Sequence, residues 1–302
     1  KCKCKHIWAV ELIVTQEVDN QGNVTITKTI RKTYSQDWKN YNLSQQKEKE
    51  YFMKLLADIT GRIQQPAYTF GKPANPLSDT IYSMVFKIYS TFSGRRFSTD
   101  LKIAKEIGFV DKKIPYNSMF DYFKKKELTP LLAQIVTITS LPLRTVEKDF
   151  AIDATGFGTS NFQRWYSFKH GKEISSRKWI KCHFITGIKT NIIPSVKITS
   201  EFDSDSPELK ELVSKTAEHF DMEEVSADKA YLSRDNMNLI EEAGATPFIP
   251  FKSNATPKPK SSPIWKKMFY YFQLNNEDFL AHYHKRSNAE SSVMMIKSKF
   301  GD

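Results

Sequence analysis

The sequence has no apolar run long enough to span a membrane and no recognisable signal peptide. The lack of such a run argues against an integral membrane protein. Cysteine is also scarce, because the 302 residues include three, and two of those fall within the first four positions. Three cysteines do not make a disulfide framework, so a reducing cytoplasm is the expected location.

Acidic residues are in deficit. Lys and Arg number 45 against 34 Asp and Glu, which gives a formal net charge of +11 and a pI of about 9.3. A strongly basic chain suggests a polyanionic partner, usually nucleic acid, whereas charge that serves solubility alone explains a smaller excess. With 40% hydrophobic residues the chain is able to bury a sizeable core, and its length suggests two domains.

Residues 1–34 predict the end of a metal-binding module followed by a β-hairpin. The chain begins at Lys1 rather than Met, so we expect a fragment. Cys4-x-His6 before an apolar strand resembles the tail of a SWIM zinc finger, and this resemblance implies a partial Zn²⁺ site that only a longer parent completes. A basic tip with incidental cysteines is the alternative, because Cys2, Cys4 and His6 supply fewer than four ligands. The Val-, Ile- and Thr-rich segments 7–15 and 24–33 flank a turn signal and predict the hairpin.

Residues 35–146 predict a helical domain. Apolar residues recur at helical spacing, and Asp79 is a candidate N-cap for a helix that runs to about residue 92. Short helices with tight connections resemble a helix-turn-helix arrangement, which contacts DNA. Residues 95–126 hold nine Lys or Arg and four Asp or Glu. The candidate phosphate contacts are Arg95, Arg96, Lys124, Lys125 and Lys126. A plain helical bundle with a basic surface is the alternative.

Residues 147–302 predict an α/β domain. Three strands, a helix, a strand, a helix, a strand and a final helix follow one another in this order. Asp153 lies towards the end of the first short apolar strand, and Asp228 ends the strand near residue 227. A carboxylate held by a buried strand suits a metal site, although a single Asp at a strand end is more often a cap or a turn residue.

The last helix, predicted over residues 276–300, carries an unusual polar stripe. Its members share one helix face because their offsets are three, four and seven residues: Tyr283, Arg286, Glu290 and Lys297. A carboxylate on this face is able to hold a metal ion while the neighbouring cations grip phosphates. An ordinary salt bridge between Arg286 and Glu290 on a surface helix is the alternative.

The spacing Tyr-x2-Arg-x3-Glu-x6-Lys is similar to the Tyr–Arg–Glu–Lys (YREK) signature of one group of DDE insertion-sequence transposases. The segments around Asp153, Asp228 and Glu290 also resemble this family, over roughly residue 38 to the end. The resemblance implies a ribonuclease-H-like mixed sheet with flanking helices, in which these three carboxylates are the catalytic residues and hold Mg²⁺ or Mn²⁺. It implies that Asp153 bridges two ions and that Asp228 and Glu290 each hold one.

Further expectations follow from the same resemblance. Arg286 and Lys297 hold DNA phosphates, while Tyr283 hydrogen-bonds a phosphate, stacks on a displaced base or simply packs in the core. The enzyme cleaves transposon ends and joins the freed 3′-hydroxyl to target DNA. Its partners are double-stranded DNA and a second copy of itself in a synaptic complex, in the cytoplasm and nucleoid of a prokaryote. The family's C-terminal helices are missing, so the domain of residues 147–302 is expected to be truncated.

Two other functions remain open at this stage. A metal-dependent nuclease on the same fold would share the three carboxylates but would not transfer strands. A transposase-derived protein that binds DNA without catalysis is the other, and the intact Asp153, Asp228 and Glu290 argue against it.

Overall fold

A computed structural model describes the backbone of residues 8–18 and 24–34, and describes residues 37–67, 70–71, 73–158, 169, 179–258 and 262–300 in full. The chain opens with an antiparallel hairpin of β1 (Trp8–Val18) and β2 (Val24–Tyr34), in which Trp8 pairs with Tyr34 and Val18 with Val24. This confirms the predicted hairpin. Cys2, Cys4 and His6 lie outside the described residues. Among the helices that the structure describes, none has the length and apolar character to cross a membrane.

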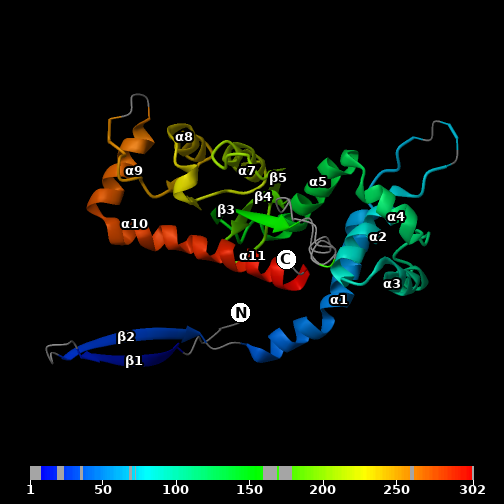
Figure 1. Ribbon diagram of the computed structural model, residues 1–302, viewed down its shortest axis with the longest axis horizontal. Coiled ribbons are helices and arrows are strands. Elements are labelled where there is room, and N and C mark those ends of the chain that lie inside the picture. Colours follow the sequence, from blue (N-terminus) through cyan, green and yellow to red (C-terminus); the bar gives the residue numbers. More distant parts are fainter. Residues whose placement is uncertain are drawn as a thin grey trace.

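A helical unit follows the hairpin, as predicted (Figure 1). Its elements are α1 (Trp38–Thr60), α2 (Leu77–Ser90), α3 (Gly94–Ile107), α4 (Tyr116–Phe123), η1 (Lys126–Leu128), α5 (Thr129–Ser140) and η2 (Leu141–Leu143). They share one apolar core, in which Tyr82 and Phe86 of α2 and Phe97 of α3 are fully buried. α3 ends at Gly108 with φ +88°, a left-handed conformation that glycine adopts without strain.

Asp79 differs from its predicted role. It lies inside the first turn of α2, where Pro76 holds the N-cap position. Its buried carboxylate instead accepts hydrogen bonds from the backbone N–H groups of Asp111 at 3.3 Å and Lys112 at 2.8 Å. The carboxylate therefore fixes the loop between α3 and α4, a contact between residues more than thirty positions apart in sequence.

The second half of the chain forms a mixed five-stranded sheet in the order β5-β4-β3-β6-β7. The strands are β3 (Asp149–Gly158), β4 (Trp179–Gly187), β5 (Ser195–Ser200), β6 (Glu224–Ala227) and β7 (Thr246–Phe248). β3, β4 and β5 are antiparallel neighbours, whereas β6 and β7 run parallel to β3. The predicted succession of strands and helices is confirmed as far as β7, after which the structure has an additional helix that was not predicted, over Pro263–Leu274. β3 is longer than predicted, so Asp153 lies in its middle.

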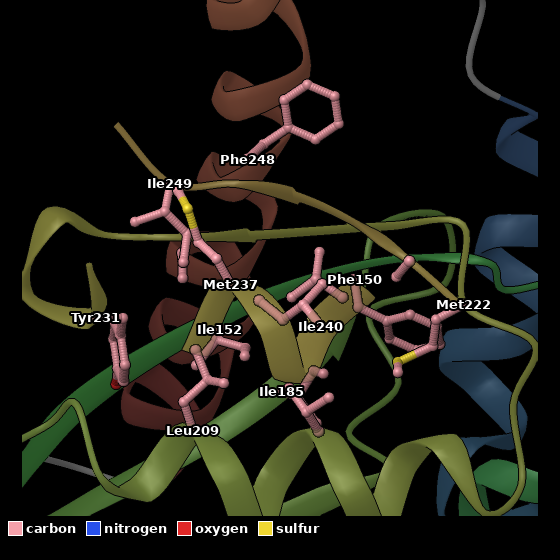
Figure 2. Close-up of a cluster of buried hydrophobic side chains, with 14 of the residues drawn as sticks. Phe150, Ile152, Ile185, Leu209, Met222, Tyr231, Met237, Ile240, Phe248 and Ile249 are labelled. Atoms are coloured by element: carbon pink, nitrogen blue, oxygen red, sulfur yellow. The ribbon is translucent and has the colours of Figure 1, made fainter. Parts of the chain in front are cut away.

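One face of this sheet is covered by α7 (Glu208–Ala217) and α8 (Arg234–Glu242). Phe150 and Ile152 of β3 project into this apolar layer, where they meet residues such as Leu209, Met237 and Ile240 (Figure 2). Because side chains alternate along a strand, Ala151 and Asp153 project from the opposite face. Dense packing on the first face holds the strand rigid and so fixes where Asp153 points.

The chain then turns back across the sheet. α9 (Pro263–Leu274) leads into α10 (Asn276–Tyr283), η4 (His284–Arg286) and α11 (Ser287–Phe300), and α11 runs below the sheet in Figure 1, on the side away from α7 and α8. The single long helix predicted over residues 276–300 is therefore interrupted by one 3₁₀ turn. Phe279 of α10 is fully buried, whereas Met294 of α11 is 71% exposed.

Candidate active site

Strand register brings the two aspartates together. Ile152 of β3 pairs with Ala227, the last residue of the parallel strand β6. Asp153 directly follows Ile152, and Asp228 directly follows Ala227, so the two aspartates occupy neighbouring positions. Adjacent strands lie about 4.8 Å apart. Ile152 and Ala227 are paired and point to one face of the sheet, so the residue after each of them, Asp153 or Asp228, points to the opposite face. Asp228 begins η3 (Lys229–Tyr231), where its carboxylate accepts a hydrogen bond from the N–H of Lys229 at 2.7 Å.

Helix α11 presents Glu290 to the same face. Ala289 is fully buried and packs in a small apolar cluster with Ala151 of β3 and Phe184 of β4. The start of the helix is also pinned to the loop between β4 and β5, since Asn288 Nδ2 donates to the carbonyl of Ile188 at 2.7 Å. The backbone beside Glu290 is thus held from two directions against the strand that carries Asp153.

Arg286 links the helix to the strand. Its Nη1 lies 3.2 Å from Oδ2 of Asp153, and its Nη2 donates to Oε1 of Glu290 at 2.6 Å. The Arg286 side chain is 17% exposed and that of Glu290 is 59% exposed. The salt bridge between Arg286 and Glu290 is therefore present. The same guanidinium also forms a second ion pair, with Asp153 of β3.

The pKa of Asp153 is shifted by burial and by its neighbours, which include the other two carboxylates. Burial raises the pKa of Asp153, the N–H of Ala154 and the charge of Arg286 lower it, and the negative charges of Glu290 and Asp228 raise it again. On balance the pKa of Asp153 lies above its ordinary value. Burial would lower the pKa of Arg286, but Asp153, Tyr283 and Glu290 hold its pKa above the usual range. The site therefore concentrates negative charge around one guanidinium.

Within the described part of the chain, no three His, Cys, Asp or Glu side chains stand close enough to form a ready-made metal cage. The donor set nevertheless fits a hard divalent cation, because Mg²⁺ and Mn²⁺ prefer carboxylate oxygens and leave positions for water and phosphate. Two of the carboxylates already share a cation, the guanidinium of Arg286. Asp153, Asp228 and Glu290 are the side chains that would hold the metal.

The two remaining stripe residues have different surroundings. Lys297 donates from Nζ to the carbonyl of Gly156 at 2.7 Å, and its ammonium lies 5.3 Å from the ring centre of Phe157, so it lies over the later part of β3. Tyr283 is half-buried and packs against the main apolar core, while Arg286 lies 5.9 Å above its ring. Packing, one of the three roles considered for Tyr283, is therefore what the structure displays.

Sequence reasoning missed Lys285, which anchors the turn that carries Arg286. Its Nζ lies 3.0 Å from Oδ2 of Asp149 and 2.7 Å from Oε2 of Glu224, at the starts of β3 and β6. Both strands that carry the site aspartates are thus tied to η4. The sequence shows Lys285 directly before Arg286 of the stripe, which could have suggested a role for it. The acidic partners of Lys285 are more than sixty residues away in sequence, so spacing does not reveal them.

The buried His183 of β4 supports the site from the neighbouring strand. Its Nε2 lies 3.0 Å from Oγ1 of Thr199, and its Nδ1 lies 3.4 Å from the hydroxyl of Tyr231. Tyr231 is buried at the end of η3, and its N–H donates to the carbonyl of Asp228 at 2.9 Å. Burial lowers the pKa of His183, so the neutral imidazole is the favoured form. His183 therefore helps to position the turn that bears Asp228.

The candidate phosphate contacts of the helical unit lie on α3 and just after α4, and all five are exposed. Arg95 and Arg96 occupy the first turn of α3. This turn packs closely on α4: the backbone at Gly94 is so near Phe120 that an added Cβ would lie 2.7 Å from its ring. Lys124 is paired with Asp121 at 2.9 Å, and Lys125 lies 4.2 Å from the ring centre of Tyr122. The five cations therefore lie on α3 and on the segment that directly follows its neighbour α4.

Comparison with known proteins gives one family match and one distant structural match. The family described as "Transposase DDE domain" matches residues 144–301, just over half of the chain. A search of curated proteins finds no match. One similar solved structure is a cryo-EM structure of the piggyBac transposase synaptic complex with hairpin DNA. It is 13% identical, with a TM-score of 0.30, and the match covers 69% of this chain and 49% of that one. That likeness is too distant to support an argument. The match over residues 144–301 is sufficient to establish that the chain belongs to the transposase DDE domain family.

Proposed function

We propose that this protein is a DNA transposase whose mixed sheet is a ribonuclease-H-like core with Asp153, Asp228 and Glu290 as its catalytic carboxylates. One observation carries the proposal: the register of β3 and β6 sets two aspartates side by side, and Arg286 joins the first of them to Glu290. The sheet order, in which three antiparallel strands continue into two parallel ones, also supports a ribonuclease-H-like core.

The three carboxylates would hold Mg²⁺ or Mn²⁺, and the resemblance to DDE transposases implies that Asp153 would be shared between two ions. Such a pair of ions, when bound, activates the attacking oxygen and stabilises the leaving oxygen of a phosphodiester. Arg286 and Lys297 place positive charge on either side of Glu290, where they would orient backbone phosphates. The buried face beneath Asp153 keeps its carboxylate fixed as DNA docks.

DNA binding by the helical unit forms part of the proposal. Arg95, Arg96 and Lys124–126 would contact phosphates, which positions the duplex without reading its sequence. The assembly would be a homodimer holding two transposon ends, and zinc would bind only in a protein that supplies the ligands missing from Cys2, Cys4 and His6. The chain spans about half the length of the similar solved structure, 49% of it, so these wider activities are proposed for the full-length protein.

The test separates three functions with two substrates. Full-length protein is incubated with Mg²⁺ and either an intact element end or a pre-cleaved end together with target plasmid. A transposase cleaves the first and joins the second to the plasmid. Cleavage without joining indicates a nuclease, and binding without either reaction indicates a non-catalytic DNA-binding protein.

Two variants complete this design. Glu290→Gln keeps the shape of the side chain but removes its charge, so we expect DNA binding to survive and both reactions to be lost. Glu277→Gln is the matched control, because Glu277 is an exposed acid in the first turn of α10 outside the stripe. It should react like the wild type. Equal activity in Glu290→Gln and wild type would overturn the proposed function.

A further inference from the structure

Arg286 contacts oxygens that the proposed metal ions require. Its two nitrogens lie 3.2 Å from Oδ2 of Asp153 and 2.6 Å from Oε1 of Glu290. A divalent ion coordinates carboxylate oxygens at about 2.1 Å, so an ion on these atoms would stand close to the guanidinium. Both groups are cations, and their repulsion in a partly buried site is only weakly screened. Metal and Arg286 therefore compete for the same two carboxylates.

We propose that Arg286 is an exchangeable internal cation, which pairs with Asp153 and Glu290 until a divalent ion binds and then moves to a DNA phosphate. This inference rests on the proposed function, because it assigns metal and DNA to the same site. Its consequence is that metal loading and the grip on DNA are linked: the guanidinium becomes available to a phosphate only when metal holds the carboxylates. By reciprocity, phosphate binding to Arg286 favours metal binding.

The surroundings of Arg286 allow its side chain to move while its backbone stays fixed. Lys285, immediately before it, is tied to Asp149 and Glu224, and Asn288, two residues after it, is tied to the carbonyl of Ile188. The Arg286 side chain is 17% exposed, so it has access to solvent, and its guanidinium lies 5.9 Å from the ring centre of Tyr283. A change of side-chain rotamer is enough for the exchange.

The other stripe cation serves as an internal contrast. Lys297 donates to the carbonyl of Gly156, and no described salt bridge connects it to Asp153, Asp228 or Glu290. A metal ion on the carboxylates therefore does not take the oxygen that Lys297 contacts. The geometry assigns competition with metal to Arg286 and leaves Lys297 as a fixed positive charge over β3.

The first test measures metal binding without DNA. Mn²⁺ is titrated by calorimetry into full-length wild type, Arg286→Gln and Arg62→Gln. Arg62 is the matched control, because it also pairs with an acid four residues away, Asp58, but lies at the end of α1. Arg286→Gln removes the competing cation, so its affinity for Mn²⁺ should exceed that of wild type by about fivefold or more, which corresponds to about 1 kcal/mol. Arg62→Gln should have the Mn²⁺ affinity of wild type. Unchanged or weaker Mn²⁺ binding in Arg286→Gln, or no binding in wild type, overturns the proposal.

The second test measures DNA binding with and without a divalent ion. Affinity for a pre-cleaved end is measured in EDTA and in Ca²⁺, which occupies carboxylate sites and is used here to hold back the reaction. In EDTA, wild type and Arg286→Gln should bind equally, because Arg286 is engaged with the carboxylates. In Ca²⁺, wild type should bind several-fold more tightly than Arg286→Gln. A permanent phosphate clamp would instead weaken the variant by the same factor in both buffers, and that result would overturn the exchange.

The two tests separate this inference from the proposed function. If wild type shows neither end cleavage nor strand transfer, the proposed function fails while the Mn²⁺ titration still reports whether Arg286 competes with metal. If the enzyme is active but Arg286→Gln shows wild-type Mn²⁺ affinity, the exchange fails alone. Thermal melting of Arg286→Gln beside Arg62→Gln confirms that both variants are folded before either comparison is made.

Discussion

Overpacking Ala289 should move the helix that carries Glu290. Ala289 is fully buried against Ala151 and Phe184, so the three additional carbons of leucine have no space unless α11 shifts away from the sheet. Such insertions into a packed core cost about 1–3 kcal/mol, whereas leucine is itself a good helix former and adds little propensity cost. The melting temperature should fall by about 2–12 °C, since about 2–4 °C is lost per kcal/mol in a protein of this size class.

The assay is thermal unfolding of Ala289→Leu beside Ser291→Leu, which adds a similar side chain to an exposed position on the same helix. Surface changes of that kind usually stay within about 0.5 kcal/mol. Cleavage of element ends should fall in Ala289→Leu alone, because the shift displaces the adjacent Glu290 from Asp153. Equal melting temperatures for the two variants would refute the packing of α11 on β3 and β4.

Three further predictions concern the residues that support the site and the helical unit. Lys285→Met should cost about 1–3 kcal/mol in urea unfolding, because Asp149 and Glu224 lose the ammonium that they share and, among its described side-chain partners, Glu224 keeps only His282. Wild-type stability would contradict this anchor. Asp79→Ala should lower stability by about 1–3 kcal/mol by stranding the N–H groups of Asp111 and Lys112, whereas no loss would show that the loop is held otherwise. Burial lowers the pKa of His183 further than Asp205 and Glu208 raise it, with Lys181 and Lys197 also lowering it. As the pH decreases below about 6.5, His183 takes up a proton in the unfolded chain before it does so in the folded protein. The free energy of unfolding should therefore decrease as the pH is lowered below about 6.5. His183→Asn should flatten this dependence in urea titrations at about pH 8 and pH 5, and an unchanged slope would contradict the buried neutral imidazole.

The order of the elements could be predicted because local patterns encode it. Segments rich in Val, Ile and Thr marked the strands of the hairpin, and a short apolar segment marked β3. The stripe of residues 283–297 was visible for the same reason. A single 3₁₀ turn such as η4 leaves almost no trace in helical spacing, so the break before Ser287 was not predicted.

The contacts that join separate elements could not be predicted. The pairing of Arg286 with Asp153, of Lys285 with Asp149 and Glu224, and of Asp79 with the loop at 111–112 all depend on distances set by the packed sheet and helices. Pattern and spacing act within about one element, whereas these partners come from different elements. This is why the sequence pointed to Glu290 and both aspartates as candidates but did not indicate that a guanidinium connects the strand to the helix.

The measurement that tests the central claim most directly is metal-directed backbone cleavage. Fe²⁺ bound in place of Mg²⁺, with ascorbate and peroxide, generates hydroxyl radicals that cut the polypeptide near the ion, and mass spectrometry locates the cuts. If Asp153, Asp228 and Glu290 share one metal centre, cuts should fall in three separate segments, in the middle of β3, at the end of β6 and at the start of α11. They should disappear together in Asp153→Asn. Cuts in one segment only, or cuts that persist in Asp153→Asn, would contradict a shared centre.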